Sequence, residues 1–285
     1  MSKVIVVTSG KGGVGKTTST AALGGALARA GEKVVVVDFD VGLRNLDLVM
    51  GAERRVVHDL INVVQGVVKV APALIRDKRV ETLFLLPASQ TRDKDALTEE
   101  GVGRVIAELR MMFDWVICDS PAGIERGATL AMRFADAAII VANSEVSSVR
   151  DSDRIVGLLD SKTVKVEKGE RMEKHLLITR FDSARAARGE MLAIEDVLEI
   201  LSVPLLGIIP ESEAVLRASN LGTPVTICSG DSPPERAYTA AARRLAGEVI
   251  EMTIPTDRKG FFNKLFGRRA ARNCSGPFNR PPPHR

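Results

Sequence analysis

Short apolar runs alternate with longer segments of helical period along most of this chain. Runs of strand length that are apolar on both faces are typical of parallel strands covered by helices on either side. The pattern therefore predicts an α/β fold, with a mostly parallel sheet and helices on both of its faces. The predicted strands are residues 3–8, 33–38, 82–87, 115–119, 137–142, 175–180 and 204–209.

Three of the intervening helices have ends that can be predicted from residue type. The segment after Thr98 carries two glutamates in its first turn and an apolar stripe of helical period, and Thr98 is a suitable N-cap. Ser212 is expected to cap a short helix that ends at Asn220. The last helix of the body is expected to run from about Pro234 to Met252.

The stretch 3–18, KVIVVTSGKGGVGKTT, joins the first predicted strand to a glycine-rich loop and then to a helix. The loop matches the spacing G-x-x-x-x-G-K-[ST], in which backbone N–H groups cradle phosphates, the lysine reaches the β and γ phosphates and the hydroxyl binds Mg²⁺. A glycine-rich turn without a ligand is the alternative, but the strand before the loop and the helix after it favour a phosphate site. The predicted site residues are Gly10, Lys11, Gly12, Gly13, Val14, Gly15, Lys16, Thr17 and Thr18.

Carboxylates end two of the predicted strands, with Asp38 and Asp40 after the second and Asp119 after the fourth. Ligands of such sheets bind beyond the carboxyl ends of the strands, so these side chains should converge on the phosphate loop. Phosphoryl transfer needs Mg²⁺ and a water in line with the γ phosphate. We predict that Asp119 serves the metal and that Asp40 orients the water from a loop that reorders with the nucleotide. For any one of them alone, a solvated strand end is the alternative.

Composition separates the body of the chain from its end. At 285 residues and 45% hydrophobic, the chain can bury a large core, and we predict one ATPase domain over residues 1–254. Eight of the 40 basic residues and none of the 36 acidic ones lie from residue 258 onward, which leaves a net charge of −4 on the rest. A basic end on an acidic body predicts an anionic partner for that end, a membrane surface or a nucleic acid. The sequence shows no leader and no run long enough to span a bilayer, so we predict a cytoplasmic protein.

The segment 258–267, RKGFFNKLFG, carries the aromatic residues of this basic end. As a helix it places its four large apolar side chains within an arc of about 140°. We predict a linker and an amphipathic membrane-targeting helix over 255–268 and a basic, proline-rich disordered tail over 269–285. A docking helix and a nucleic-acid tail are the alternatives. The predicted membrane-binding residues are Phe261, Phe262, Leu265 and Phe266.

Several motifs together resemble a known family. The loop KGGVGKTT resembles the deviant Walker A loop of the MinD/ParA ATPases, and five further stretches resemble, in order, motifs of the MinD-type septum-site ATPases. These stretches are DFDVGLRNLDLVMG (38–51), CDSPAGIE (118–125), EVSSVRDSDRI (145–155), LLITRF (176–181) and IPESEAVLRASN (209–220). The similarity runs from residue 3 to about residue 267.

The resemblance implies a role for each matching position. Lys16 and Thr17 would hold phosphate and Mg²⁺. Lys11 would cross a dimer interface to the nucleotide of the partner subunit; the alternative for Lys11 is a solvated loop lysine. Asp40 would act on water. The resemblance further assigns Asp38 and Asp119 to the metal, Arg180, Pro210 and Glu211 to the surroundings of adenine, and Arg150, Asp151 and Asp153 to a helix near the dimer and partner surface. A solvated helix face is the alternative for the last group.

Two features depart from the family pattern. Asp182 stands where the family often has an asparagine-like residue, and a carboxylate cannot donate an amide hydrogen to the base. The chain also continues with RRAARNCSGPFNRPPPHR beyond the predicted membrane helix.

The function implied is an ATP-dependent switch with ATP and Mg²⁺ as cofactors. MgATP would assemble a homodimer that binds anionic lipids on the inner face of the cell membrane and recruits a MinC-like division inhibitor and a MinE-like activator. Hydrolysis, slow without a partner, would release it. The main alternative is a ParA-like partition ATPase that binds DNA non-specifically and in a salt-dependent way. The phenylalanines favour the membrane, so nucleic acid is not the expected partner. A metabolic P-loop kinase or ligase would need a second-substrate motif, which we do not find.

Overall fold

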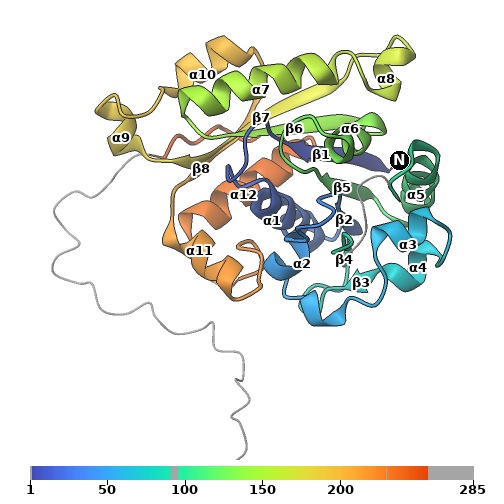
Figure 1. Cartoon of the computed structure of the whole chain (residues 1–285). Coiled ribbons are helices and arrows are strands. Elements are labelled where there is room, and N and C mark those ends of the chain that lie inside the picture. Colours follow the sequence, from blue (N-terminus) through green and yellow to red (C-terminus); the bar gives the residue numbers. More distant parts are fainter. Residues whose placement is uncertain (1, 91–95, 229, 256–285) are drawn as a thin grey trace, which may run out of the picture.

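A mixed sheet forms the centre of the computed structural model, which describes residues 2–90, 96–228 and 230–255 (Figure 1). Within this part the sheet has eight strands in the order β3-β4-β2-β5-β1-β6-β7-β8. Neighbouring strands are parallel except for β3 and β4, which are antiparallel. The strands are β1 (Lys3–Thr8), β2 (Val34–Asp38), β3 (Ile75–Arg76), β4 (Leu83–Leu86), β5 (Trp115–Asp119), β6 (Ala137–Ala142), β7 (Glu173–Phe181) and β8 (Leu205–Pro210).

Helices cover both faces of the sheet, as Figure 1 shows. One hydrophobic core lies between the sheet and α1 and α12, and the other lies between the sheet and α5, α6, α7 and α10. The helices are α1 (Lys16–Arg29), α2 (Leu46–Val49), α3 (Leu60–Val64), α4 (Val70–Ala73), α5 (Glu99–Met112), α6 (Arg126–Arg133), α7 (Val146–Leu159), α8 (Val164–Glu167), α9 (Ser183–Ala187), α10 (Ile194–Leu201), α11 (Glu213–Asn220) and α12 (Pro233–Leu245), with a 3-10 turn η1 (Glu53–Arg55).

The predicted α/β class, parallel sheet and seven strands are confirmed. Both faces of β1 are buried because α1 packs on one face and α6 on the other, while its two edges pair with β5 and β6. This burial explains its uninterrupted apolar run. The predicted caps are also confirmed, since Thr98 accepts from the N–H of Gly101 and Ser212 accepts from the N–H of Ala214. Strand β3 was not predicted, because two residues are too few to form a recognisable pattern.

The predicted end of the last helix at Met252 is wrong, because α12 ends at Leu245. Gly247 has φ +98, in the left-handed region that favours glycine. Its N–H donates to the carbonyl of Arg244, and the next N–H, of Glu248, donates to the carbonyl of Arg243. These two bonds form a Schellman motif, which satisfies the last carbonyls and turns the chain away from the helix axis.

No helix within the described ranges is both long and apolar enough to cross a bilayer. The predicted membrane-targeting helix with its four apolar residues, and the tail 269–285, lie outside the described residues.

Candidate nucleotide site

The phosphate loop connects β1 to α1, and its glycines allow its shape. Gly13 and Gly15 have φ values of +78 and +96, which residues with a side chain rarely adopt. At Gly10 a Cβ atom would lie 2.2 Å from the backbone of Asp151 in α7, so no side chain fits there. Glycine is therefore required at positions 13 and 15 by the backbone conformation, and at position 10 by the close contact with α7.

Side chains of β7 hold the outer side of this loop. The hydroxyl of Thr179 donates to the carbonyl of Val14 at 2.6 Å, and Nη1 of Arg180 donates to the carbonyl of Gly13 at 3.5 Å. Carbonyl oxygens that are occupied by these donors are kept from facing an anion, so the N–H groups of the loop can do so.

Lys16 is the first residue of α1, and its side chain is buried next to carboxylates. Burial lowers the pKa of Lys16, while the charges of Asp119 and Asp40 act in the opposite direction. Both carboxylates are thus close enough to interact with the ammonium group. Of the three carboxylates predicted to converge on the phosphate loop, Asp119 and Asp40 thus act on Lys16.

Asp119 ends β5 opposite Val7 of β1 and is fully buried. Burial raises the pKa of Asp119 to about 7, although hydrogen bonds from Thr17 and Thr20 and the charge of Lys16 lower it. The hydroxyl of Thr20 lies 3.1 Å from Oδ1. A buried carboxylate with a raised pKa is stabilised by a nearby cation. With the Thr17 hydroxyl it offers the oxygen ligands that suit Mg²⁺, which usually takes one or two protein carboxylates together with phosphates and water.

Asp38 pairs in register with Asp119 on the neighbouring strand. Its Oδ1 accepts from the N–H of Asp40 at 2.9 Å and its Oδ2 accepts from the N–H of Leu46 at 3.3 Å. Burial, and then the charge of Asp119, raises the pKa of Asp38 well above its usual value. Asp38 therefore holds the loop that carries Asp40, a contact that its predicted metal role did not include. Among the described residues, no three His, Cys, Asp or Glu side chains form a cluster that could hold a metal by themselves.

Lys11, at the other end of the loop, contacts α7. Its Nζ lies 2.7 Å from Oε2 of Glu145, which precedes α7, and 3.0 Å from the hydroxyl of Ser147. The hydrogen bond from Lys11 lowers the pKa of Glu145. The side chains of Lys11 and Glu145 remain 38% and 47% exposed. This ion pair belongs to the surface class, which stabilises by about 0–1 kcal/mol.

The predicted adenine-side residues lie at the ends of β7 and β8. Arg180 has φ +54 and pairs through Nη2 with Oε1 of Glu211 at 3.2 Å, directly after Pro210. Asp182 is the N-cap of α9, where it accepts from two backbone N–H groups at 2.9 and 3.0 Å. Aspartate and asparagine are both good N-caps, which gives this departure from the family pattern a structural role.

Helix α7 carries the predicted partner-surface residues and separates them into two groups. Arg150 and Asp153 are exposed, whereas Asp151 is partly buried because its backbone contacts Gly10. The helix therefore connects an exposed face directly to the phosphate loop.

Sequence reasoning missed three residues that shape the site: Thr20, Thr179 and Glu145. Thr20 lies one helical turn after Lys16, so a polar residue in an apolar helix could have indicated it. Thr179 and Glu145 depend on contacts over 165 and 134 residues, which no local pattern contains.

Comparison with known proteins agrees with this geometry. Residues 5–225 match the CobQ/CobB/MinD/ParA nucleotide binding domain family. The septum site-determining protein MinD of Neisseria meningitidis is 58% identical over 271 residues, which cover 94% of this chain and all of that protein.

Solved structures extend the comparison. A MinC:MinD cell division protein complex from Aquifex aeolicus matches with 41% identity and a TM-score of 0.80, covering 89% of this chain and 99% of the matched chain. MinD from Pyrococcus horikoshii, complexed with Mg-ADP, matches with 29% identity and a TM-score of 0.76, covering 86% of this chain and 96% of the other. The predicted nucleotide-binding fold and the resemblance are thereby confirmed, and the chain belongs to the MinD family of septum site-determining proteins.

Proposed function

We propose that this chain is an ATPase that dimerises with MgATP, binds the inner face of the cell membrane as a peripheral protein, recruits regulators of division-septum placement and leaves on hydrolysis. The observation that carries the proposal is the contrast within one phosphate loop, where Lys16 is buried against carboxylates and Lys11 is held at the surface. MinD relatives and the Mg-ADP complex of one of them support septation as the role and ATP with Mg²⁺ as the cofactors.

Lys16 and the N–H groups of residues 10–18 would bind the phosphates, and Thr17 and Asp119 would hold Mg²⁺. When bound, the metal neutralises charge on the phosphates during transfer. Asp40 orients the attacking water from the loop that Asp38 anchors. Turnover is slow without an activating partner protein, and a single subunit also lacks the cation that the second subunit of the dimer supplies.

That cation is Lys11. In the single chain it is occupied by Glu145 and Ser147, through contacts that are exposed and weak. Facing the phosphates of a second subunit, it would exchange one surface carboxylate for several phosphate oxygens, which favours the ATP dimer.

Membrane binding is proposed from sequence, since Phe261, Phe262, Leu265 and Phe266 lie outside the described residues. An interfacial helix of this size binds weakly as a single copy, and each nearby Lys or Arg adds about 1 kcal/mol on an anionic leaflet. A dimer makes the insertion of the second helix intramolecular and raises retention by orders of magnitude.

Partner recruitment is proposed for the exposed side of α7. The MinC:MinD complex supports a MinC-like partner, and a MinE-like activator is proposed from the family resemblance. Arg150 and Asp153 are exposed on this helix, and Asp151 contacts the phosphate loop, so a bound partner could act on the loop directly.

Liposome sedimentation tests the proposal. We expect the chain to sediment with anionic liposomes in ATP and to remain in the supernatant in ADP. Phe262→Asp should abolish sedimentation and leave nucleotide binding unchanged, because the substitution affects the apolar face only. Equal sedimentation in ADP and ATP would contradict the switch.

The alternative is a ParA-like partition ATPase. Salt-sensitive DNA binding in ATP, without liposome binding, would favour this alternative over the membrane role.

A further inference from the structure

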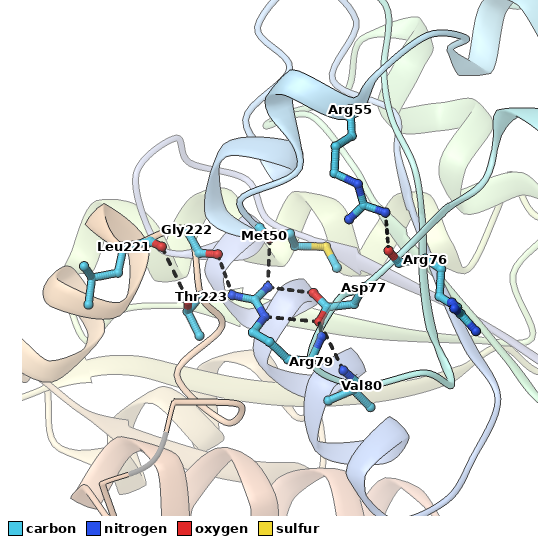
Figure 2. Close-up of polar contacts among 9 residues, drawn as sticks. All are labelled: Met50, Arg55, Arg76, Asp77, Arg79, Val80, Leu221, Gly222 and Thr223. Atoms are coloured by element: carbon cyan, nitrogen blue, oxygen red, sulfur yellow. Dashed lines mark hydrogen bonds and ion pairs between the residues drawn. The ribbon is translucent and has the colours of Figure 1, made fainter. Parts of the chain in front are cut away.

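Arg79 lies in the turn between β3 and β4 and joins two segments that are distant in sequence. Its Nη2 donates to the carbonyl of Met50 at 2.8 Å, and its Nη1 donates to the carbonyl of Gly222 at 2.9 Å and to the hydroxyl of Thr223 at 2.6 Å. Figure 2 shows the guanidinium between these groups. One side chain thereby holds the end of α2 against the turn that follows α11.

The orientation of Arg79 is fixed by Asp77. The carboxylate accepts from Nε at 3.1 Å and from Nη2 at 2.6 Å, and Oδ1 also accepts from the backbone N–H groups of Arg79 and Val80 (Figure 2). The side chain of Asp77 is 3% exposed. Burial alone would raise the pKa of Asp77, but the hydrogen bonds from Arg79 lower it overall. Only the planar fork of arginine can make this bidentate contact and still donate to two carbonyls.

The two joined segments also touch through their backbones. A Cβ atom at Gly51 would lie 2.6 Å from the carbonyl oxygen of Gly222, and one at Gly222 would lie 2.7 Å from Cα of Gly51. Both glycines have positive φ, +62 and +60. Helices α2 and α11 lie side by side as a result (Figure 1).

Each segment leads to a different end of the nucleotide site. Helix α2 begins at Leu46, whose N–H is bound by Asp38, and the loop between them carries Asp40. Helix α11 begins just after Glu211, which pairs with Arg180, and Arg180 donates to Gly13 of the phosphate loop. The contacts of Arg79 therefore connect the water side of the site to the base side.

We propose that Arg79 is a positioning residue for hydrolysis, which holds the Asp40 loop in place by joining α2 to α11. The inference rests on the proposed ATPase function and adds a residue that lies outside the phosphate-binding set.

The test compares Arg79→Ala with Arg55→Ala as the control. Arg55 lies in the same neighbourhood, and Figure 2 shows its hydrogen bond from Nη2 to the carbonyl of Arg76 at 2.6 Å. Three quantities are measured in the full chain: the amide hydrogen exchange of residues 40–52 and 221–223, the affinity for MgADP, and single-turnover phosphate release from ATP.

For Arg79→Ala we expect exchange in both segments to rise at least about tenfold, because the three hydrogen bonds from the charged guanidinium to Met50, Gly222 and Thr223 are lost. Phosphate release should fall about tenfold or more, while the affinity for MgADP stays within about threefold, because Arg79 contacts Met50, Asp77, Gly222 and Thr223 and not the phosphate loop. Arg55→Ala should behave like the parent. Arg79→Lys keeps the charge without the fork and should remain defective.

If amide hydrogen exchange and phosphate release in Arg79→Ala both stay at the rates of the parent, the inference is overturned. A parallel loss of affinity and turnover, with faster exchange over the whole chain, would also overturn it, because Arg79 would then only stabilise the fold. Parental amide exchange and phosphate release in Arg79→Lys would show that a positive charge alone suffices, and would overturn the claim that the planar guanidinium is required. If the parent itself releases no phosphate, the proposed function fails, and the exchange rates alone decide whether Arg79 joins the two segments.

Discussion

The two lysines of the phosphate loop, five positions apart, have opposite environments. Lys16 is 8% exposed and interacts with Asp119, which is buried at the end of β5, and with Asp40, which is half-buried in the loop after β2. Lys11 keeps 38% of its side chain exposed and interacts with Glu145, next to a surface helix. Lys16 is therefore fixed among buried carboxylates, whereas Lys11 can exchange its surface partner for another anion.

The difference in burial determines which lysine can change its ion-pair partner. A buried charge that loses its partner costs several kcal/mol, so Lys16 stays in its own site. An exposed ion pair is worth about 0–1 kcal/mol, so a competing anion can take Lys11 from Glu145. We therefore propose that the inner lysine serves its own subunit and the outer lysine serves the partner.

The largest effect is expected from Lys16→Ala. Removing the ammonium leaves Asp119 and Asp40 without their cation and takes a contact from the phosphates, so MgATP affinity should fall at least about 100-fold. Titration with a fluorescent nucleotide measures it, with Lys11→Ala as the matched lysine control, which should keep at least part of the affinity. Equal losses in both variants would remove the distinction between the two ends of the loop.

Asp40→Ala should come next, with its effect on hydrolysis rather than on binding. Without a group to orient water, phosphate release should fall about 100-fold or more, while the ATP dimer persists. Phosphate release and light scattering report the two quantities separately. Parental phosphate release would show that Asp40 is not needed for the step.

The smallest effect is expected from Glu145→Gln, which weakens the contact that holds Lys11 in the single chain. Each subunit of the dimer is freed of an ion pair worth at most about 1 kcal/mol, so ATP-dependent dimerisation should strengthen up to about 30-fold. Glu167→Gln, which removes an exposed carboxylate paired with Arg133, is the control and should change nothing. Weaker dimerisation in Glu145→Gln would mean that Glu145 supports the dimer instead of restraining it.

Local pattern was sufficient for most of the fold and for the inner end of the site. Apolar runs located seven strands, and the motif placed Lys16 and Thr17 at the start of α1 because strand, loop and helix are consecutive in sequence. The end of α12 could also have been predicted, since Gly247 is the signal of its Schellman motif.

The contacts of Lys11 and of Arg79 could not be predicted from the sequence. The contact of Lys11 with Glu145 spans 134 residues, and that of Arg79 with Gly222 spans 143 residues. Such pairs depend on strand order and helix placement, which hydrophobic periodicity does not specify.

A mixing experiment tests most directly the claim that the two lysines serve different subunits. Lys11→Ala and Asp40→Ala are each expected to be inactive alone, for different reasons. In a mixed dimer, the site of the Lys11→Ala subunit has its own Asp40 and receives Lys11 from its partner. When equal amounts are mixed before ATP is added, we predict that phosphate release recovers to at most about a quarter of the parental rate. This limit corresponds to random pairing, in which half of the dimers are mixed and one of their two sites is complete. A mixture as inactive as its components would mean that Lys11 acts within its own subunit, and would contradict the account.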